Sequence, residues 1–319
     1  NMSLVVTGGA GFIGAHFVRL AISSGILGEH GNSIKIIDNL SYASDLNRLS
    51  NIIDLPQVSF IKADIADYEV ISSVINSGDS IINFAAESHV DNSIRESSAF
   101  IHSNVVGVDN LLSISRLKNI RKFVQVSTDE VYGSISTGQF YEDSKLNPSS
   151  PYSASKAAAD LLCLAAYKTF DLNVSITRAA NNYGPMQFPE KIIPLFIKLL
   201  LKNKPVTLYG NGENQREWLH VDDHCQGIIK VLRNGAPGEI YNIGSGISLS
   251  NLELTHLILS ALNKSTNMIE FVNDRLGHDL RYAVNFDRIK SELGYQPTRD
   301  IRIDISEIVN SYTQTYLNE

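Results

Sequence analysis

An α/β fold, with a doubly wound parallel sheet and a smaller C-terminal lobe, is predicted by three features of the sequence. Short apolar segments typical of strands alternate with longer segments of helical periodicity over the first half of the chain. A glycine-rich turn joins the first strand to the first helix. Prolines at positions 185, 189, 194 and 205 interrupt the chain where this alternation ends. Strands separated by helices of this length form right-handed βαβ units, which build a parallel sheet covered on both faces.

Six short segments are predicted as strands because they are apolar and bounded by turn residues; they are Ser3–Thr7, Ile34–Asp38, Val58–Ile61, Ser80–Phe84, Phe123–Val126 and Val174–Arg178. Helical periodicity predicts helices at Phe12–Ser24, Phe100–Arg116, Tyr152–Phe170, Ile192–Lys202, Asp222–Asn234, Ser250–Ala261 and Asp304–Tyr316. This pattern divides the chain into a sheet domain over residues 1–178 and a lobe mainly over residues 179–319. We expect a later segment, about residues 217–242, to pack back on the sheet domain, and the lobe to cover the carboxyl ends of the strands.

The composition is that of an ordinary globular protein. The chain has 319 residues, a hydrophobic fraction of 43% and a net charge of −7, which argues against a general nucleic-acid or anionic-membrane surface. Two cysteines, Cys163 and Cys225, are too few for a disulfide framework. No apolar run is long enough to span a membrane, and the first strand begins at residue 3, which leaves no room for a signal peptide. We therefore expect a cytoplasmic location.

The segment Thr7-Gly8-Gly9-Ala10-Gly11-Phe12-Ile13-Gly14 joins the first strand to the first helix. Gly8 permits the tight turn, Gly11 lets the backbone approach a pyrophosphate, and Gly14 allows close packing of helix on sheet. The phosphates would then lie at the helix N-terminus, where free N–H groups favour negative charge. Asp38, 24 residues after Gly14, stands where a carboxylate accepts from the ribose hydroxyls of NAD and repels the 2′-phosphate of NADP. The sequence therefore predicts a Rossmann-like NAD-binding domain.

Each of these features has a plainer explanation when taken alone. Glycines spaced in this way occur in ordinary turns, and Asp38 could simply open a turn before Asn39. The order of strand, loop and helix favours the cofactor. Asp64 and Ile65, after the third strand, could then flank the adenine, and the small residues Ala85, Ala86 and Ser88 follow the fourth strand where ribose and phosphate would pass.

Tyr152 and Lys156 lie one helical turn apart, so both side chains project from the same face of their helix. A free phenol titrates at about 10 and is a poor base at neutral pH. A neighbouring ammonium and a cationic nicotinamide ring both favour the phenolate, which moves Tyr152 toward useful basicity. This spacing also arises by chance on surface helices, but the glycine loop and Thr128 favour the functional interpretation.

A hydroxyl and two carboxylates follow the fifth strand within the segment Ser127-Thr128-Asp129-Glu130-Val131-Tyr132-Gly133. A nearby carboxylate raises the pKa of an aspartic acid, as a proton donor requires. The structural alternative is that Thr-Asp-Glu merely forms a helix N-cap or a turn.

These motifs resemble the extended short-chain dehydrogenases/reductases and, more narrowly, the nucleotide-sugar 4,6-dehydratases, above all those acting on dTDP-glucose. The resemblance runs nearly end to end and is carried by Gly8–Gly14, Phe84–Asp91, Ser127–Gly133, Ser150–Lys156, Asn181–Pro185, Phe188–Lys191, Arg216–Trp218, Tyr241–Gly244 and Asp274–Asp279. Thr-Asp-Glu is the most specific of these motifs, because epimerases and reductases carry other residues beside the Thr or Ser.

The resemblance implies oxidation of a nucleotide-linked hexose at C4, elimination of water across C5 and C6, and return of the hydride to C6. Tyr152 would take the proton of the 4-hydroxyl, while Lys156 holds the nicotinamide ribose. Thr128 would bind the 4-hydroxyl, Glu130 would remove the C5 proton, and Asp129 would protonate the departing C6 hydroxyl. The product would be a 4-keto-6-deoxy sugar, most simply from dTDP-glucose.

The resemblance also implies contact residues. For NAD these are Gly8, Gly11, Phe12, Ile13, Gly14, Asp38, Asn39, Asp64, Ile65, Ala85, Ala86, Ser88, Ser103, Tyr152, Lys156 and Asn182. For the nucleotide sugar they are Ser88, Thr128, Asn181, Lys191, Ile192, Thr207, Leu208, Tyr209, Arg216, Asn242, Asp274, Arg275 and His278. The family further implies a homodimer paired through Phe100–Arg116 and Tyr152–Phe170.

Several alternatives stay open on the sequence. The substrate could be UDP-glucose or another nucleotide sugar, and a 4-epimerase or an inactive nucleotide-binding regulator would share parts of the pattern. Single arginines, and His278, could be solvated or structural. Met186, Leu276 and Ser44-Asp45 depart from the usual family residues, and we expect the first two to border the substrate pocket. Glu87 and His89 alone are too few ligands to indicate a metal site.

Overall fold

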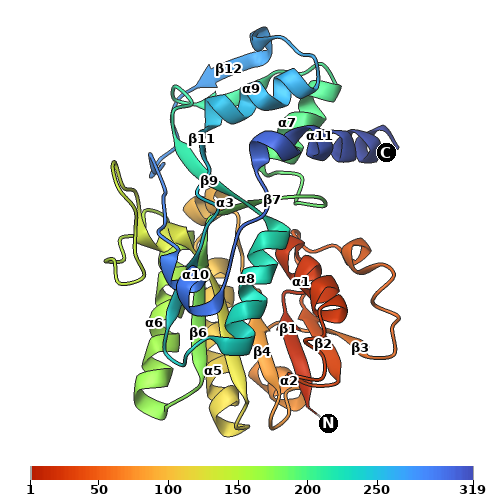
Figure 1. The fold of residues 1–319 in the computed structure, drawn as a ribbon, viewed down its shortest axis with the longest axis vertical. Coiled ribbons are helices and arrows are strands. Elements are labelled where there is room, and N and C mark those ends of the chain that lie inside the picture. The colour runs from red at the N-terminus through yellow and green to blue at the C-terminus, as the bar shows by residue number, and fades with distance from the viewer. Residues whose placement is uncertain (1, 319) are drawn as a thin grey trace.

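The protein, described by a computed structural model over residues 2–318, is built around a seven-stranded sheet (Figure 1). All strand pairs are parallel, in the order β10-β6-β5-β4-β1-β2-β3. The strands are β1 (Ser3–Thr7), β2 (Ser33–Asp38), β3 (Val58–Lys62), β4 (Ser80–Asn83), β5 (Lys122–Thr128), β6 (Val174–Ala179) and β10 (Ile240–Ile243). The strand order reverses between β1 and β4, where parallel sheets open a crevice at their carboxyl ends.

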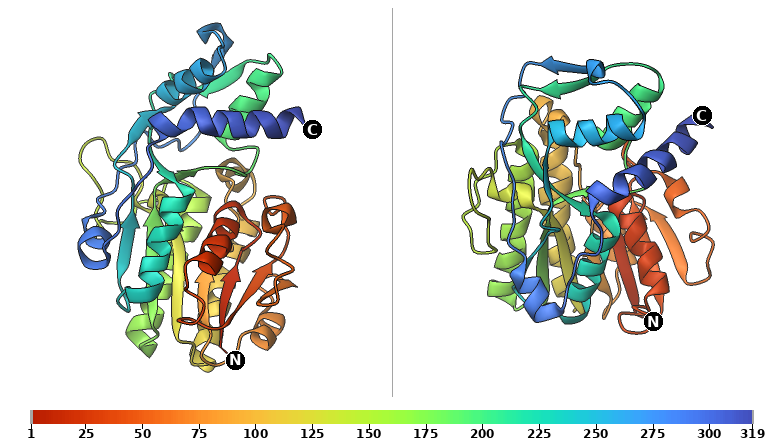
Figure 2. Two further views of the ribbon diagram at one scale, coloured as in Figure 1. Left: turned by 45° about the vertical axis from the view of Figure 1, so that its right-hand side comes forward. Right: turned by 45° about the horizontal axis from the view of Figure 1, so that its top comes forward.

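Helices cover both faces of this sheet (Figure 2). On one face lie α1 (Phe12–Ser23) and α8 (Val221–Asn234), which bury Phe17 and Ile228 against β-strand residues such as Ile36. On the other lie α2 (Tyr68–Val74), α5 (Gly107–Leu117) and α6 (Pro151–Phe170), which bury Leu111 and Cys163 against Phe123. The central strands β1 and β4 are buried on both faces, so they are mostly apolar rather than alternating.

The smaller lobe lies beyond the carboxyl ends of the sheet and has its own apolar core (Figure 1). It contains a three-stranded sheet of β7 (Asn181–Tyr183), β9 (Gln215–His220) and β11 (Ser248–Ser250), and a pair formed by β8 (Val206–Tyr209) and β12 (Ile269–Val272). Its helices are α7 (Ile192–Leu201), α9 (Asn251–Ala261) and α11 (Ile301–Leu317). Phe196, Ile258 and Ile305, one from each helix, are buried together.

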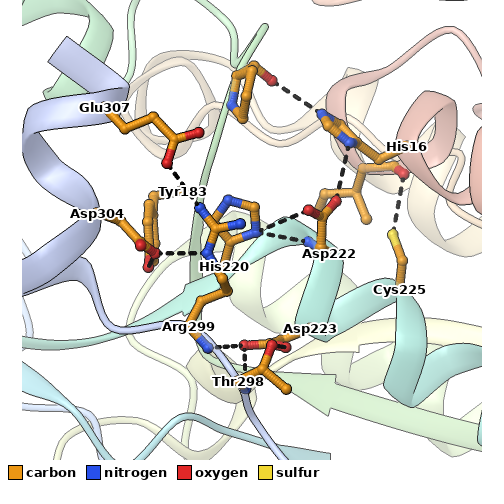
Figure 3. A network of polar contacts seen from close by, with 12 residues as sticks. His16, Tyr183, His220, Asp222, Asp223, Cys225, Thr298, Arg299, Asp304 and Glu307 are labelled. Carbon is orange, nitrogen blue, oxygen red and sulfur yellow. Dashed lines mark hydrogen bonds and ion pairs between the residues drawn. The ribbon is translucent and has the colours of Figure 1, made fainter. Parts of the chain in front are cut away.

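A polar network ties the lobe to the sheet domain (Figure 3). Asp222, at the start of α8, lies 3.6 Å from His16 Nδ1 of α1 and 3.6 Å from His220 Nδ1 at the end of β9. Asp223, the next residue, accepts from the backbone N–H of Arg299, 2.9 Å away, just before α11. Arg299 in turn donates to Asp304 of α11. Elements far apart in the sequence are thereby joined at one point.

The predicted fold class is confirmed, and the six predicted strands are present within two residues at either end. The helix expected at Phe100–Arg116 is divided into α4 (Ser98–Ile101), a π-helical segment at His102–Val106 and α5. The short elements α3 (Val90–Arg95), α10 (Asp287–Leu293) and β7 to β12 were not predicted, because short half-polar segments carry little periodicity. Of the segment at about 217–242, α8 and β10 pack on the main sheet, whereas β9 belongs to the lobe. No helix within residues 2–318 is long and apolar enough to cross a membrane.

Candidate active site

A cleft of about 380 Å³ opens at the carboxyl ends of the main sheet, beneath the lobe. Every residue predicted to contact the cofactor lines it: Gly8, Gly11, Phe12, Ile13, Gly14, Asp38, Asn39, Asp64, Ile65, Ala85, Ala86, Ser88, Ser103, Tyr152, Lys156 and Asn182. The cleft also receives Thr128 and Glu130 of the predicted catalytic segment, and the predicted substrate residues Asn181, Lys191 and Ile192. The fold thus brings together residues that are distant in the sequence.

The glycine loop has the geometry of a dinucleotide cradle. Gly8 has a φ of +70°, and a Cβ there would lie 2.6 Å from the backbone nitrogen of Ala85. A Cβ on Gly14 would lie 2.2 Å from the carbonyl oxygen of Gly8. A side chain at Gly8 would push the turn after β1 away from the segment after β4, and a side chain at Gly14 would push α1 away from that turn. Either change would disrupt the close backbone packing at the predicted pyrophosphate site. The residues present therefore fit an NAD molecule lying across the switch point.

Asp38 is a buried carboxylate with three protein donors. Oδ2 accepts from the N–H of Ala10 at 2.9 Å, and Oδ1 accepts from the N–H of Leu40 at 2.8 Å and the hydroxyl of Ser44 at 2.7 Å. A carboxylate has about four lone-pair positions, so one remains for a ribose hydroxyl. Ser44, a departure from the usual family residue, thus takes part in fixing Asp38. The turn and cofactor interpretations of Asp38 are both compatible with this geometry.

The segment that carries the hydroxyl and two carboxylates forms a short 3₁₀ helix, η3 (Asp129–Tyr132), directly after β5. Thr128 Oγ1 accepts from the N–H of Glu130 at 3.2 Å, so Thr128 caps this helix. Thr128 also lines the cleft. The cap that was the structural alternative is therefore present, and it holds the threonine at the site rather than removing it.

Asp129 and Glu130 differ in their surroundings. Burial, and then the charges of Glu130 and Glu217, raise the pKa of Asp129 well above its usual value, and one of its oxygens has no partner. Burial also raises the pKa of Glu130, but Arg216, Lys191 and Arg275 oppose this rise. Asp129 is therefore the better proton donor of the pair, and Glu130 the better base.

Tyr152 and Lys156 lie on the first turns of α6 and both line the cleft. Lys156 Nζ donates to the carbonyl of Val126 at 2.9 Å, and burial lowers its pKa. Burial, and then the charges of Glu130 and Asp129, raise the pKa of Tyr152. In the protein without its cofactor the phenol is therefore hard to ionise; the expectation that Lys156 and the cationic nicotinamide ring together lower the phenol pKa concerns the complex with NAD and stays a prediction.

Four predicted substrate residues gather at the edge of the lobe. His278 Nδ1 lies 2.7 Å from Asp274 Oδ1, and the His278 ring packs edge-on against Tyr209. The Arg275 guanidinium lies 5.9 Å from the centre of the Tyr209 ring and 3.4 Å from Asp91 Oδ1. The Nε of Arg275 is buried without a partner. This group does not line the cleft itself, but an aromatic ring beside a cation suits a base and its phosphates.

Arg216, also predicted to bind substrate, is buried over the ring of Tyr282 and donates to the carbonyl of Asp279 at 3.0 Å. Its charge reaches Asp129 and Glu130, as their pKa shifts show. Its predicted contact with the nucleotide stays a prediction. Thr207, on β8, is exposed beside Tyr209.

Two residues predicted to contact the substrate, Asn242 and Leu208, are buried in the structure and do not line the cleft. Asn242 is fully buried in β10, where its side chain accepts from Tyr132 at 2.7 Å and donates to the carbonyls of Phe140 and Asn285. Its amide is used within the protein and does not reach the cleft. The Leu208 side chain is 2% exposed in the lobe core and has no surface for a nucleotide.

His224 lines the cleft although its sequence context gave no sign of a site. Its Nδ1 lies 2.9 Å from Asn182 Oδ1, while Asn182 Nδ2 donates to the carbonyl of Ala180 at 3.0 Å. Burial lowers the pKa of His224 to about 3, so the ring is neutral and fixes the Asn182 amide. The sequence does show that His224 has helical spacing from Val221 and Ile228, which predicts that it lies on the buried face of α8.

Met186 and Leu276, expected to border the substrate pocket, are exposed and line no part of the cleft. Leu276 has 79% of its surface exposed. Within residues 2–318, no three His, Cys, Asp or Glu side chains are grouped as metal ligands. His89 instead accepts from the N–H of Asn92 as the N-cap of α3, and its Nε2 lies 3.1 Å from Glu190.

The chain is similar to known proteins over nearly its whole length. The sequence model of the GDP-mannose 4,6 dehydratase family matches residues 5–308. A dTDP-glucose 4,6-dehydratase of Actinoplanes sp. is 46% identical over 312 residues, 98% of either chain. The crystal structure of the dTDP-glucose 4,6-dehydratase DesIV from Streptomyces venezuelae, with NAD and dTDP bound, is 45% identical with a TM-score of 0.95 and covers 98% of this chain and 97% of that one.

A UDP-glucuronic acid 4-epimerase of Bacillus cereus, solved with its substrate and NAD, has a TM-score of 0.90, covers 99% of this chain and 100% of its own, and is 25% identical. Dehydratases and epimerases thus share the architecture, while the higher identity lies with the dehydratases. Since the family model spans most of the chain and the relatives match it end to end, the chain belongs to the GDP-mannose 4,6 dehydratase family and is similar throughout to its dTDP-glucose 4,6-dehydratases.

Proposed function

We propose that the protein is an NAD-dependent lyase that converts dTDP-glucose to its 4-keto-6-deoxy derivative. One observation carries this proposal: Thr128 and Glu130 line the same cleft as Tyr152 and Lys156, and Asp129 is adjacent to Glu130 in η3. An epimerase needs the tyrosine and the cofactor but no such acid and base. The similarity to dTDP-glucose 4,6-dehydratases over 98% of the chain supports the substrate.

Bound NAD supplies a hydride acceptor for C4 of the sugar and later a hydride donor for C6. Tyr152 removes the proton of the 4-hydroxyl, and Thr128 orients that hydroxyl. Lys156, held by the carbonyl of Val126, contributes a positive charge and binds the nicotinamide ribose. In the protein alone the phenol is protonated, so we propose that binding of the cationic cofactor lowers its pKa toward the working range.

The ketone at C4 acidifies the proton at C5, because the resulting carbanion is delocalised onto oxygen. Glu130 removes this proton while Asp129 gives its own proton to the C6 hydroxyl, which leaves as water. Arg216, Lys191 and Arg275 keep Glu130 more easily ionised than Asp129. The burial that raises the pKa of Asp129 keeps that group able to donate.

We further propose that residues 1–178, together with α8 and β10, form the domain that binds the cofactor. The rest of residues 179–319 would form the lobe that binds the nucleotide sugar. Ser88, Asn181, Lys191 and Ile192 lie in the shared cleft and suit the sugar and diphosphate. Tyr209, Asp274, Arg275 and His278, with the neighbouring Thr207, suit the base. The two free, buried cysteines are compatible with a cytoplasmic enzyme.

The decisive experiment is incubation of the purified protein with dTDP-glucose, UDP-glucose or UDP-N-acetylglucosamine, followed by detection of a 4-keto product. We expect product from dTDP-glucose at the highest kcat/KM. Product only from a UDP-sugar would move the substrate assignment to another nucleotide sugar. A galactose nucleotide as the only product would establish a 4-epimerase, and binding without turnover would indicate a nucleotide-binding regulator.

We also propose a homodimer paired through the helices around α5 and α6. Apolar side chains on this surface are unusually exposed, including Ile101, Val106, Leu161 and Phe170 at 47%, 43%, 56% and 52%. A groove between the two helices is lined in part by Leu112, Leu162 and Phe170. A second copy of the same face would cover these groups. Light scattering should give the mass of a dimer, which Leu161→Glu should halve; a wild-type monomer at working concentration would exclude this face as an interface.

A further inference from the structure

Both ends of the acid–base segment Thr128–Val131 are attached to one buried ion pair. Before the segment, Ser127 Oγ donates to Asp160 Oδ2 at 3.0 Å. After it, the hydroxyl of Tyr132 accepts from Arg178 Nη1 at 3.1 Å, and the Arg178 guanidinium lies 4.9 Å from the centre of the Tyr132 ring. The segment that contains Asp129 and Glu130 is therefore held at both ends by contacts with the same ion pair.

The ion pair joins the strand on one side of the segment to the helix on the other. Arg178 Nε of β6 donates to Asp160 Oδ2 of α6 at 2.8 Å, and the two residues are 1% and 0% exposed. Asp160 follows Lys156 by one turn of α6, and Lys156 Nζ itself donates to Val126 at the end of β5. Two successive turns of the helix that bears Tyr152 are thus bonded to the last residues before Thr128.

Tyr132, which follows the segment, is also bonded to β10, the edge strand of the sheet. Tyr132 donates its hydroxyl proton to Asn242 Oδ1 at 2.7 Å, and the backbone N–H of Asn242 donates to Glu142 at 3.1 Å. This explains why Asn242 is unavailable to substrate. The network thus spans β5, β6, α6 and β10.

Stability alone does not account for such a pair. Desolvation of two charges largely offsets their attraction, and apolar side chains of similar volume are often as stable. A buried polar network, in contrast, rigidifies its surroundings and specifies one arrangement of its groups. Oδ1 of Asp160 has no partner, which indicates that the site tolerates an energetic cost.

We propose that Asp160 and Arg178 are positioning residues that hold the acid–base segment at both ends and set its distance from Tyr152 and Lys156. This inference rests on the proposed dehydratase function. Neither residue needs to touch the substrate. Loss of the attachment at one end would let Asp129 and Glu130 shift relative to the sugar, and a displacement of about 1 Å can reduce a rate about 100-fold.

The test uses variants that each remove one hydroxyl, Ser127→Ala and Tyr132→Phe, together with the double variant. Ser115→Ala is the matched control, because Ser115 is also buried and donates to a backbone carbonyl, at 2.6 Å, far from the segment. Four quantities are measured with dTDP-glucose: melting temperature, NAD retained on purification, KM, and the separate single-turnover rates of cofactor reduction and product release.

We expect both single variants to retain NAD and KM within about twofold, while kcat falls about 10- to 100-fold through the elimination step. The double variant should lose less than the product of the two single losses, because both hydroxyls act through one ion pair. Ser115→Ala should lower the melting temperature without changing kcat.

Unchanged kcat in both Ser127→Ala and Tyr132→Phe would overturn the positioning role. The role would also be overturned if these variants changed melting temperature and kcat only as much as Ser115→Ala does. Asp160→Asn leaves Arg178 as a buried cation without its counter-charge and can fail to fold, so the single-hydroxyl variants carry the decision. A wild-type protein that makes no 4-keto product would instead refute the proposed function, and the two failures are therefore distinct.

Discussion

Asp129 and Glu130 are adjacent in the chain, yet the fold gives their carboxyl groups different protonation. Asp129 is enclosed with two other carboxylates nearby, and three cations approach Glu130. The cations belong to β9, to the start of α7 and to the loop after β12. The division of labour between acid and base therefore depends on single charges supplied by the lobe.

The variant Glu130→Gln tests this division. Gln keeps the shape of the side chain but cannot take the C5 proton, so substrate should still reduce bound NAD while product formation falls about 10²- to 10⁴-fold. Absorbance of the reduced cofactor and a product assay separate the two steps. Glu69→Gln, at an exposed position in α2, is the control and should behave as wild type. A normal product rate in Glu130→Gln would remove Glu130 from the elimination.

Glu217 should make stability depend on pH. Burial raises its pKa from 4.5 to about 7, although Ser245 N–H donates to it. The folded protein thus binds this proton more tightly than the unfolded chain does. The contribution is fully present below about pH 4.5 and is lost as pH rises through 7, by roughly 3 kcal/mol in total.

The comparison is made with Glu217→Gln, which cannot titrate but keeps an acceptor for Ser245. Urea unfolding between about pH 5 and 8 should show Glu217→Gln gaining stability relative to wild type as pH rises. A difference that stays constant over this range would show that Glu217 does not titrate there.

At the scale of elements, the loop before α11 joins the lobe to α8 of the sheet domain, and Asp304 of α11 holds that loop and β7 together (Figure 3). Asp304 of α11 accepts from the Tyr183 hydroxyl at 2.7 Å and from Arg299 Nε at 3.0 Å. Tyr183 lies on β7, two residues after Asn181 in the cleft, and packs edge-on against His220. These contacts thus hold α11 against β7, the strand that supplies Asn181 and Asn182 to the cleft.

The variant Asp304→Asn weakens two charge-assisted hydrogen bonds at this junction and should lower the free energy of unfolding by about 1–3 kcal/mol. Glu307→Gln is the control, because Glu307 is 76% exposed and lies 3.5 Å from the same arginine. It should change stability by less than about 0.5 kcal/mol. Equal losses in the two variants, measured by denaturant unfolding, would contradict a special role for the buried contact.

At the scale of the whole molecule, bound NAD should stabilise the folded protein, because the cleft lies between the main sheet and the lobe that covers it. NAD at about 100 times its Kd should stabilise the folded protein by about 2.7 kcal/mol. NADP should stabilise much less, because its 2′-phosphate would meet the carboxylate of Asp38. Thermal unfolding with either nucleotide measures this; equal shifts would show that Asp38 does not select the cofactor.

The main sheet, the glycine cradle, the Tyr152–Lys156 pair and the Thr128–Glu130 segment could all be predicted from the amino-acid sequence. These features are local: strand and helix periodicity, a turn that only glycine permits, and a spacing of one helical turn are all properties of neighbouring residues. The predicted cofactor residues that follow β1 to β4 reach the cleft for the same reason, since strand ends and the turns after them meet at one edge of a parallel sheet.

The tertiary structure alone decided how these groups are charged and held. The pKa of Tyr152 depends on burial and on Asp129 and Glu130, which lie more than twenty residues away in the chain. Asn242 matched a family motif but became part of the core, and His224 matched none but fixes Asn182. Desolvation and contacts between distant segments exist only once the chain is folded, so no pattern of neighbouring residues records them.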